Sequence, residues 1–118
     1  NAFEEHLAAN GTRVVKIFLQ VSRDEQKLRF EERLADRAKQ WKFDPADLQM
    51  RRRWDDFQRA YEVAFEKTST TEAPWYIVPA DKKWVRDLAV AHILVDVLEH
   101  LDPRYPEPRF DPASIKLE

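Results

Sequence analysis

Two kinds of apolar pattern alternate along the chain and predict four helices around two buried strands. Residues 13–22, RVVKIFLQVS, are almost continuously apolar and rich in β-branched side chains, which is typical of a strand buried on both faces. Residues 75–80, WYIVPA, have the same character. The predicted order is therefore helix, strand, helix, helix, strand, helix.

Capping residues mark the first two helices. The first ends at Asn10 and Gly11, because glycine accepts the left-handed conformation that closes many helices. Ser22 is the predicted N-cap of the second helix, residues 23–37, and Glu25 follows three residues later. This spacing is a capping box, so we expect two reciprocal hydrogen bonds there.

The third and fourth helices are predicted to be long and amphipathic. Asp44 and Pro45 start the third, which we expect to continue without a break to about residue 67. The fourth starts at Asp81, and its apolar stripe is broad enough to pack against a sheet or between helices. That stripe contains Trp84, Leu88, Ala91, Val95, Leu98 and Leu101 and is widened by Val90, Ile93, Leu94 and Val97.

The order of these elements predicts the α/β fold class. Strands that alternate with helices run parallel and are joined by right-handed crossovers. Two parallel strands do not make a viable sheet by themselves, so we expect further strands from residues outside this chain. We therefore interpret residues 1–118 as the C-terminal part of a larger domain. Without the rest of that domain, residues 14–21 would expose an apolar edge.

Composition narrows the classes of function. A net charge of -2 argues against nucleic-acid-binding and polybasic membrane proteins, which carry a strong surplus of Lys and Arg. The absence of cysteine excludes disulfides and fits a reducing compartment. No apolar run approaches the ~20 residues that span a bilayer, and the first residues lack a signal-peptide pattern, so we expect a cytoplasmic protein.

Gly11 is the single glycine of the sequence. Loops that cradle phosphate with backbone N–H groups need several glycines, so neither common phosphate-loop motif exists in these residues. Any phosphate bound by this chain must therefore be held by side chains.

Five stretches of the sequence resemble the polyphosphate kinase 2 family. They are KIFLQVSRDEQKLRFEERL, WKFDPADL, RWDDF, TSTTEAPWYIVPADKKW and VLEHLDPRYP, and the similarity runs from residue 13 to about residue 106. The resemblance implies a P-loop, thymidylate-kinase-like fold with a three-layer parallel sheet and a helical lid. It implies reversible transfer of a phosphoryl group between inorganic polyphosphate and a nucleoside mono- or diphosphate (AMP, ADP/ATP or GDP/GTP), with Mg2+ as cofactor.

The resemblance also divides the chain. Residues 1–22 correspond to a helix end and a buried strand, residues 23–67 to the lid region, residues 73–101 to the last strand and helix, and residues 102–118 to a proline-rich extended arm. The phosphate loop and the Walker B strand lie in the preceding half of the family's domain. We therefore expect this chain to need that N-terminal half as its partner, to be inactive alone, and to belong to a homo-oligomer.

Positive charge is concentrated in the predicted lid. Residues 23–53 contain ten Lys and Arg against seven Asp and Glu, a net charge of +3 in a chain of net charge -2. Arg29, Arg33 and Arg37 recur at four-residue intervals and would form one stripe on a helix face. Guanidinium groups suit phosphate oxygens, and phosphoryl transfer depends mainly on positioning and charge neutralisation.

Site roles follow from these residues together with the resemblance. Arg33 is the first catalytic candidate, with Arg29 beside it, because both fall in the family's R-F-x-x-R stretch. Arg37, Lys42 and Arg52 are further candidate ligands of the substrate phosphates. A lysine at position 42 would act as a mobile point charge.

Three acids are candidates for the magnesium site. Asp47 is predicted to hold Mg2+ or to orient the acceptor oxygen as a catalytic residue, and Asp55, with Asp56, is a weaker candidate for the same work. Asp47 also has a structural interpretation, because an acid in the first turn stabilises a helix dipole.

Other charged residues have structural alternatives as well. The pairs Arg51 with Asp55, Arg52 with Asp56, and Asp55 with Arg59 are each four residues apart. Exposed pairs at this spacing contribute only ~0.3 to 0.5 kcal/mol. On the last helix, His92, Asp96 and His100 share the same spacing, and we interpret the two histidines as surface residues because a third strong metal ligand is lacking.

Two other functions compete with a polyphosphate-dependent enzyme. One is a non-catalytic helical module that binds a polyanion or a protein through its basic stripe. The other is a fragment of an ATP-dependent nucleoside-monophosphate kinase, which the stretches APWYIVPAD and RWDDF argue against.

Overall fold

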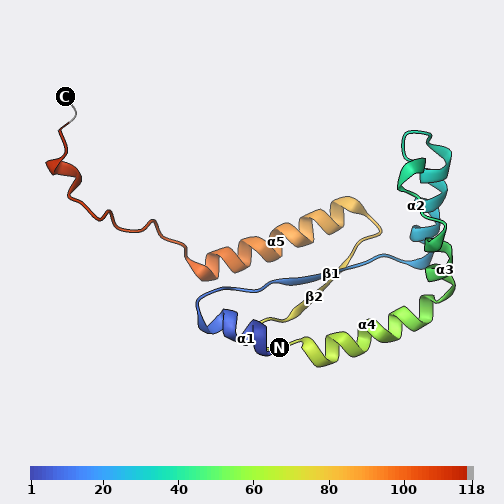
Figure 1. The fold of residues 1–118 in the computed structure, drawn as a ribbon, viewed down its shortest axis with the longest axis horizontal. Coiled ribbons are helices and arrows are strands. Elements are labelled where there is room, and N and C mark those ends of the chain that lie inside the picture. The colour runs from blue at the N-terminus through green and yellow to red at the C-terminus, as the bar shows by residue number, and fades with distance from the viewer. Residues whose placement is uncertain (117–118) are drawn as a thin grey trace.

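Two parallel strands lie between two helices, and a separate group of helices projects from one end of the sheet (Figure 1). This computed structural model describes residues 1–116. The elements are α1 (Ala2–Ala9), β1 (Lys16–Gln20), α2 (Arg23–Ala35), the 3-10 helix η1 (Gln40–Lys42), α3 (Ala46–Arg52), α4 (Trp54–Thr68), β2 (Trp75–Pro79), α5 (Lys83–Leu101) and the 3-10 helix η2 (Pro112–Ser114). This confirms the mixed α/β class and the parallel pairing.

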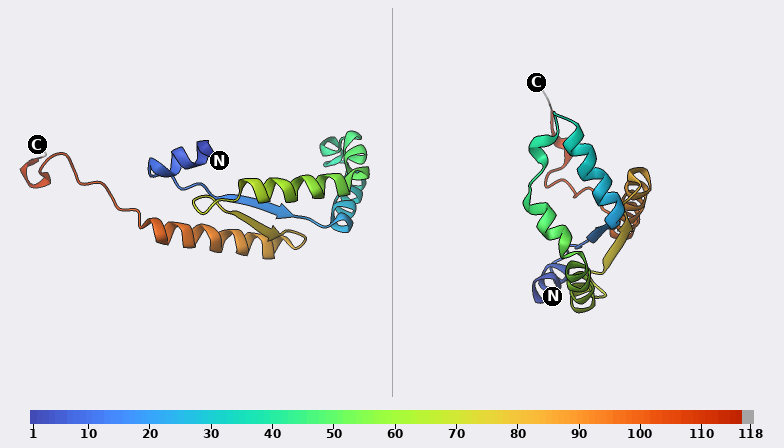
Figure 2. Two further views of the ribbon diagram at one scale, coloured as in Figure 1. Left: turned by 90° about the horizontal axis from the view of Figure 1, so that it is seen from below. Right: turned by 90° about the vertical axis from the view of Figure 1, so that its right-hand side faces the viewer.

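The sheet is covered on both faces. The two strands pair from Lys16 opposite Trp75 to Gln20 opposite Pro79. Helices α4 and α5 lie on opposite sides of the strands, which makes three layers (Figure 2). On the α5 side, Val78 and Val97 are buried.

Aromatic rings fill the layer between α4 and the sheet. The ring of Phe18 in β1 lies 4.7 Å from that of Tyr61 and 5.0 Å from that of Phe65, measured between centroids. Phe65 is in turn 5.4 Å from Trp75 of β2. The predicted apolar face of this helix therefore packs against both strands, where edge-to-face and tilted contacts between rings are favourable.

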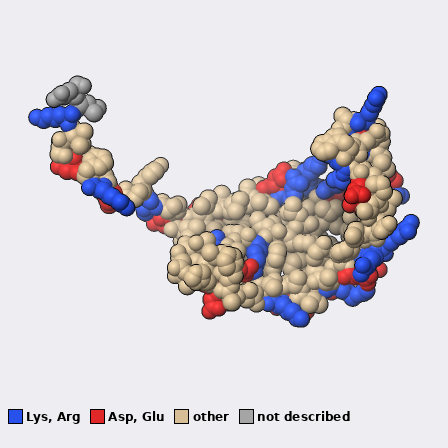
Figure 3. Space-filling model, in the orientation of Figure 1, with Lys and Arg blue, Asp and Glu red and all other residues tan. Residues whose placement is uncertain are grey.

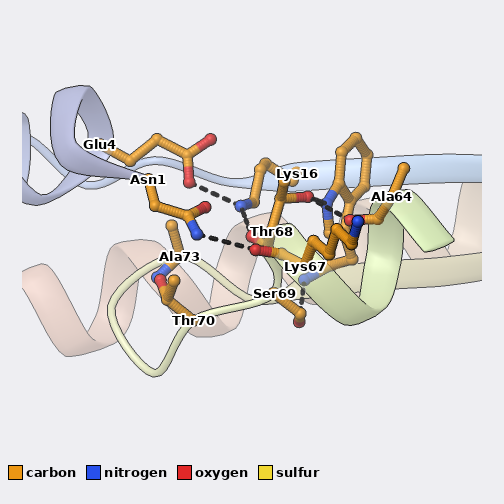
Figure 4. A network of polar contacts seen from close by, with 10 residues as sticks. Asn1, Glu4, Lys16, Ala64, Lys67, Thr68, Ser69, Thr70 and Ala73 are labelled. Carbon is orange, nitrogen blue, oxygen red and sulfur yellow. Dashed lines mark hydrogen bonds and ion pairs between the residues drawn. The ribbon is translucent and has the colours of Figure 1, made fainter.

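Lys16 joins three elements at the start of β1 (Figure 4). Its side chain is 9% exposed, and its Nζ donates a 2.6 Å hydrogen bond to Glu4 of α1 and another to the backbone carbonyl of Thr68 at the end of α4. The same ammonium group lies 5.5 Å from the ring centroid of Trp75. A charge in a predicted apolar strand is thus satisfied by an acid, a carbonyl and an aromatic face.

The predicted capping box forms only in part. Ser22 caps α2, because its Oγ accepts a 3.1 Å hydrogen bond from the backbone N–H of Glu25. The reciprocal bond is absent, since the Ser22 N–H donates to Asp81 in a tertiary contact and the Glu25 carboxylate accepts from Arg29 one turn later in the same helix. Helix α2 ends at Ala35, two residues earlier than predicted.

The prediction of one continuous helix to residue 67 is wrong. The chain breaks at Arg53, where φ is -97° and ψ is 26°, so α3 and α4 are separate helices. Helix α4 packs on the sheet through Phe65, whereas α3 belongs to the projection, and the chain must turn between them. The start of this region also differs, because Pro45 occupies the N-cap position and Asp44 Oδ1 accepts from the N–H of Ala46.

Helix α5 buries only one side of its predicted broad apolar stripe. Val97 is buried, and Val85, Val90 and Ile93 are half-buried on the side that meets β2. The other side of the stripe is exposed. Its exposed large members are Trp84, Leu88, Val95, Leu98 and Leu101.

The described residues have an extended shape. The radius of gyration is 21.6 Å, whereas a compact domain of this length measures roughly 13–14 Å. The projection and the C-terminal arm account for this, since they leave the body at opposite ends (Figure 1). None of the helices within residues 1–116 has the length and apolar character that crossing a membrane requires.

Candidate functional site

The candidate site is the carboxyl edge of the sheet together with the projection that rises from it, which we define as residues 23–53. Strand β1 ends at Gln20 and α2 begins at Arg23, so the projection starts at that edge. In open parallel sheets, ligands bind beyond the carboxyl ends of the strands. Figure 3 shows Lys and Arg side chains over this end of the molecule, mixed with Asp and Glu.

Short-range contacts hold the projection together. The rings of Phe30 and Phe43 meet edge to face at 5.5 Å and bring the connector back onto α2. Gln40 Nε2 donates a 2.8 Å hydrogen bond to the carbonyl of Leu34, and Trp41 Nε1 donates a 3.0 Å bond to that of Ala38. The indole of Trp41 remains 78% exposed, so it does not serve as a packing residue within the described chain.

Arg29 is held by protein groups on both sides. Its Nε donates a 2.8 Å hydrogen bond to Glu25, one turn earlier. Its Nη2 donates to the backbone carbonyls of Ala80, at 2.7 Å, and Asp81, at 3.2 Å, just beyond β2. The first member of the predicted phosphate-binding stripe therefore spans the gap between the projection and the sheet.

Arg33 and Arg37 differ from Arg29 in their surroundings. The guanidinium of Arg33 lies 5.7 Å from the ring centroid of Phe30 and forms no hydrogen bond with residues 1–116. Arg37 is exposed and lies past the end of α2, so it is not on the same helix face. The predicted stripe thus comprises Arg29 and Arg33, with Arg37 in the connector.

The other candidate cations lie on the returning half of the projection. Lys42 is exposed, and its Nζ lies 5.2 Å from the ring centroid of Trp41. Arg52 is exposed near the end of α3. Arg51 instead points back to α2, where its Nη1 donates 2.6 Å and 3.0 Å hydrogen bonds to the carbonyl of Arg23 and the Gln26 side chain.

The predicted ion pairs at four-residue spacing do not form within the described chain. Asp56 instead accepts from Arg53 at 3.3 Å and from Arg59 at 2.5 Å, both three residues away. The break at Arg53 separates Arg51 from Asp55 and Arg52 from Asp56, so these pairs no longer share one helical register, whereas Arg59 pairs with Asp56 in place of Asp55 within α4. Asp55 is exposed in the first turn of α4, and Asp47 is half-buried in the first turn of α3.

Hydrogen bonds shift the pKa values of three groups in this region. The pKa of Asp81 lies below its ordinary value because its carboxylate accepts a 2.7 Å hydrogen bond from the backbone N–H of Ser22. In the connector, Asp36 and Lys39 form a 2.8 Å pair. The hydrogen bond from Lys39 lowers the pKa of Asp36, and the same bond raises the pKa of Lys39.

A pocket of about 510 Å3 opens between the end of β1 and the base of the projection. It is lined by Phe18, Leu19, Gln20, Val21, Gln26, Met50, Arg51, Trp54, Phe57, Gln58 and Tyr61. Trp54, Phe57 and Tyr61 recur at three- and four-residue intervals, the spacing of one helix face. The three glutamines carried no sequence signal, because their meeting depends on the fold.

Metal ligands do not cluster in the described residues. No three His, Asp or Glu side chains within residues 1–116 come together in an arrangement that holds a metal ion. His92 and His100 are exposed on α5, and His100 Nδ1 lies 2.7 Å from the Asp96 carbonyl oxygen. Ser22 and Asp81, which connect the two strand ends, were identified from the sequence solely as helix starts.

Comparison with known proteins gives consistent matches. A family model described as polyphosphate kinase 2 matches residues 1–106. The chain is 49% identical over 116 residues to the AMP/ADP-polyphosphate phosphotransferase of Meiothermus ruber, a match that covers 98% of this chain and 43% of that protein. It is 48% identical over 104 residues to the ADP-polyphosphate phosphotransferase of Rhodopseudomonas palustris, with 88% and 36% covered.

A solved structure agrees with these matches. The crystal structure of polyphosphate kinase 2 from Arthrobacter aurescens TC1 superposes with a TM-score of 0.91 at 49% identity, over 97% of this chain and 40% of that one. The chain spans less than half the length of each of these three relatives.

Proposed function

This chain belongs to the polyphosphate kinase 2 family, and we propose from that membership that it forms part of a polyphosphate-dependent phosphotransferase. The complete domain moves a phosphoryl group between inorganic polyphosphate and a nucleoside mono- or diphosphate. In this proposal the projection, residues 23–53, is the lid, which covers the phosphates at the carboxyl edge of the sheet. Relatives named as AMP/ADP-polyphosphate and NDP-polyphosphate phosphotransferases support this substrate class.

The observation that carries the proposal is the availability of Arg33. Arg33 is half-buried, and its guanidinium lies over the Phe30 ring and forms no hydrogen bond with the described residues, one helical turn beyond the Arg29 contacts with the sheet. A cation held in place by packing, with its donors free, suits phosphate oxygens whose charge changes during transfer. Lys42, Arg37 and Arg52 extend this cationic surface on the lid.

Each side chain contributes to transfer in a different way. Arg33 stabilises the equatorial oxygens of the phosphoryl group during its transfer, because the loose transition state of phosphoryl transfer is stabilised mainly by positioning and charge. Lys42 neutralises polyphosphate as a flexible point charge. Closure of the lid excludes water, which strengthens these contacts and prevents hydrolysis.

We propose Mg2+ as the cofactor. Asp47, half-buried, and Asp55, exposed, offer the hard carboxylate oxygens that this ion prefers. Either acid alone would serve, because this ion binds through one or two carboxylates and retains water and substrate phosphates as its other ligands. When bound at these residues, the ion would supply charge neutralisation for the substrate phosphates.

The rest of the assembly is also proposed. A three-layer P-loop kinase fold, with phosphate loop and Walker B strand outside residues 1–118, would cover apolar side chains such as Leu19 and Ile77, which are 44% and 55% exposed here. A cytoplasmic homo-oligomer is the expected form of the complete protein. We expect residues 1–118 alone to show no turnover.

A coupled assay tests the proposed function. The complete protein that contains residues 1–118 is mixed with long-chain polyphosphate, Mg2+ and ADP or AMP, and nucleotide products are measured. Formation of ADP or ATP that depends on polyphosphate supports the proposal. Transfer from ATP without polyphosphate would instead indicate an ATP-dependent nucleoside-monophosphate kinase.

The exposed lid surface also favours a second candidate, a non-catalytic module that binds polyanions or proteins. Trp41 and Lys42 lie together on the lid and are exposed. Binding of polyphosphate without turnover, weakening steeply with salt, would favour this alternative.

A further inference from the structure

We propose that Arg29 and Asp81 are positioning residues that together set the angle of lid helix α2 relative to the sheet. The proposal deepens the function proposed above and rests on it for its kinetic consequences. It adds a latch, defined as Ser22, Glu25, Arg29, Ala80 and Asp81, in which the end of β2 holds the first turns of α2.

The latch has two arms. In the first, Asp81 Oδ1 accepts a 2.7 Å hydrogen bond from the backbone N–H of Ser22, the N-cap of α2, although 59 positions separate them in the sequence. In the second, Arg29 Nη2 donates to the carbonyls of Ala80 and Asp81 while its Nε is held by Glu25 at 2.8 Å.

The sheet end of the latch is firmly anchored. Ala80 is 1% exposed, and its N–H donates a 2.8 Å hydrogen bond to the carbonyl of Gln20, which extends the pairing of the two strands. The lid end is also fixed, since the side chain of Arg29 is 23% exposed and that of Glu25 is 25% exposed. The two strand ends and the first turns of α2 thus form one hydrogen-bonded unit.

Few other polar contacts hold the lid to the body. Arg51 bonds to Arg23 and Gln26, which lie inside the lid, and Arg53 bonds to Asp56 on the adjoining α4. Within residues 1–116, Arg29 is the lid residue whose side chain forms hydrogen bonds with the end of β2. The bond between Ser22 and Asp81 lies just before the first lid residue. The angle of α2 therefore depends on the latch.

This position gives the latch control over Arg33. Arg33 is one helical turn beyond Arg29 on the same face of α2, so a tilt of the helix at its first turn moves the Arg33 guanidinium. Small misplacements of a group that contacts the reacting atoms reduce turnover by roughly 100-fold. Arg29 would then act through Arg33 and not as a phosphate ligand itself.

The test uses four latch variants and one control variant of the complete protein. Asp81→Ala removes the acceptor of the Ser22 bond, whereas Asp81→Asn retains an acceptor oxygen. Arg29→Met removes the second arm, and Arg29→Met with Asp81→Ala removes both. Asp87→Ala is the control, because this exposed acid on α5 pairs with Arg86 and faces no part of the latch.

Amide hydrogen exchange of residues 23–35 is measured together with kcat and KM. We expect Asp81→Ala and Arg29→Met each to increase exchange at least fivefold and to lower kcat about 10-fold, with KM for the nucleotide changed less than threefold, because small displacements cost turnover before binding. Asp81→Asn and Asp87→Ala should stay within twofold of wild type. The double variant should have a kcat no lower than that of the more impaired single variant.

Three results would overturn the latch. They are exchange in α2 that Asp81→Ala leaves unchanged, an Asp81→Asn variant as impaired as Asp81→Ala, and effects of the two arms that add in the double variant. If wild type transfers no phosphate from polyphosphate, the proposed function fails, whereas the exchange measurements still decide whether the latch exists.

Discussion

The ammonium group of Lys16 lies 2.6 Å from the carboxylate of Glu4, and this contact joins the first strand to helix α1. The lysine side chain is 9% exposed and that of the acid 23% exposed, so the pair is largely shielded from water. Removal of one partner from such a pair leaves the other charge uncompensated, which is more costly than the loss of an exposed pair.

We therefore expect Lys16→Met to lower the free energy of unfolding by about 3 kcal/mol. Glu4→Gln with Lys16→Met should cost less than the sum of the single changes, because the remaining charge is removed as well. Urea unfolding of the complete protein measures both. Lys27→Met is the control, since its pair with Glu31 is more than half exposed on each side, and its loss should cost less than about 0.5 kcal/mol.

Gly11 is a second stability determinant. Its φ is +78°, and a Cβ added there would meet no atom within 4 Å, so the cost of a side chain is conformational. Gly11→Ala should lower the free energy of unfolding by about 1 kcal/mol, and Gly11→Asn by less, because asparagine tolerates the left-handed region better. Equal stability of Gly11→Ala and wild type in chemical denaturation would contradict this account.

Arg33 is the site residue whose replacement should affect turnover most directly. Arg33→Ala should reduce kcat with polyphosphate roughly 100-fold, as expected for loss of one donor to a charge that develops in the transition state. Arg33→Lys should recover part of this loss, because the charge returns without the planar fork. Arg59→Ala is the matched control, since Arg59 is exposed, pairs with Asp56 and lies on α4 outside the lid. A normal kcat for Arg33→Ala would remove this residue from the mechanism.

The latch should weaken in acid without opening, because protonated Asp81 loses its charge but still offers an acceptor oxygen to the Ser22 N–H. The bond from Ser22 lowers the pKa of Asp81 in the folded protein, so the carboxylate stabilises the latch above its ordinary pKa of 3.8, and this contribution is lost as pH falls through the lower folded value. Arg29 is the opposite charge that faces it.

We expect exchange protection at the start of α2, corrected for intrinsic rates, to decrease across that pH range in wild type toward the level of Asp81→Asn, and to change less in Asp81→Asn itself. Parallel curves for the two proteins would show that other carboxylates govern the transition.

Much of the secondary structure was predictable because its causes are local. Continuous apolar runs identified both strands, Gly11 marked the end of α1, and Ser22 marked the start of α2. Helix caps and apolar periodicity act within about one turn of a helix or a few residues of a strand. The motifs that resemble the polyphosphate kinase 2 family were equally visible, and the family match confirms that interpretation.

Tertiary structure alone decided the features that depend on distant partners. Arg29 reads in sequence as a member of a basic stripe, but the carbonyl it binds belongs to Ala80, 51 positions away. The break at Arg53 has no composition signal, because it arises where α4 must lie on the sheet and α3 must leave it. The sequence by itself determined both strands, the end of α1 and the start of α2, and the family resemblance, because these depend on local residues, whereas packing across the sheet determined the break at Arg53 and which side chains are engaged.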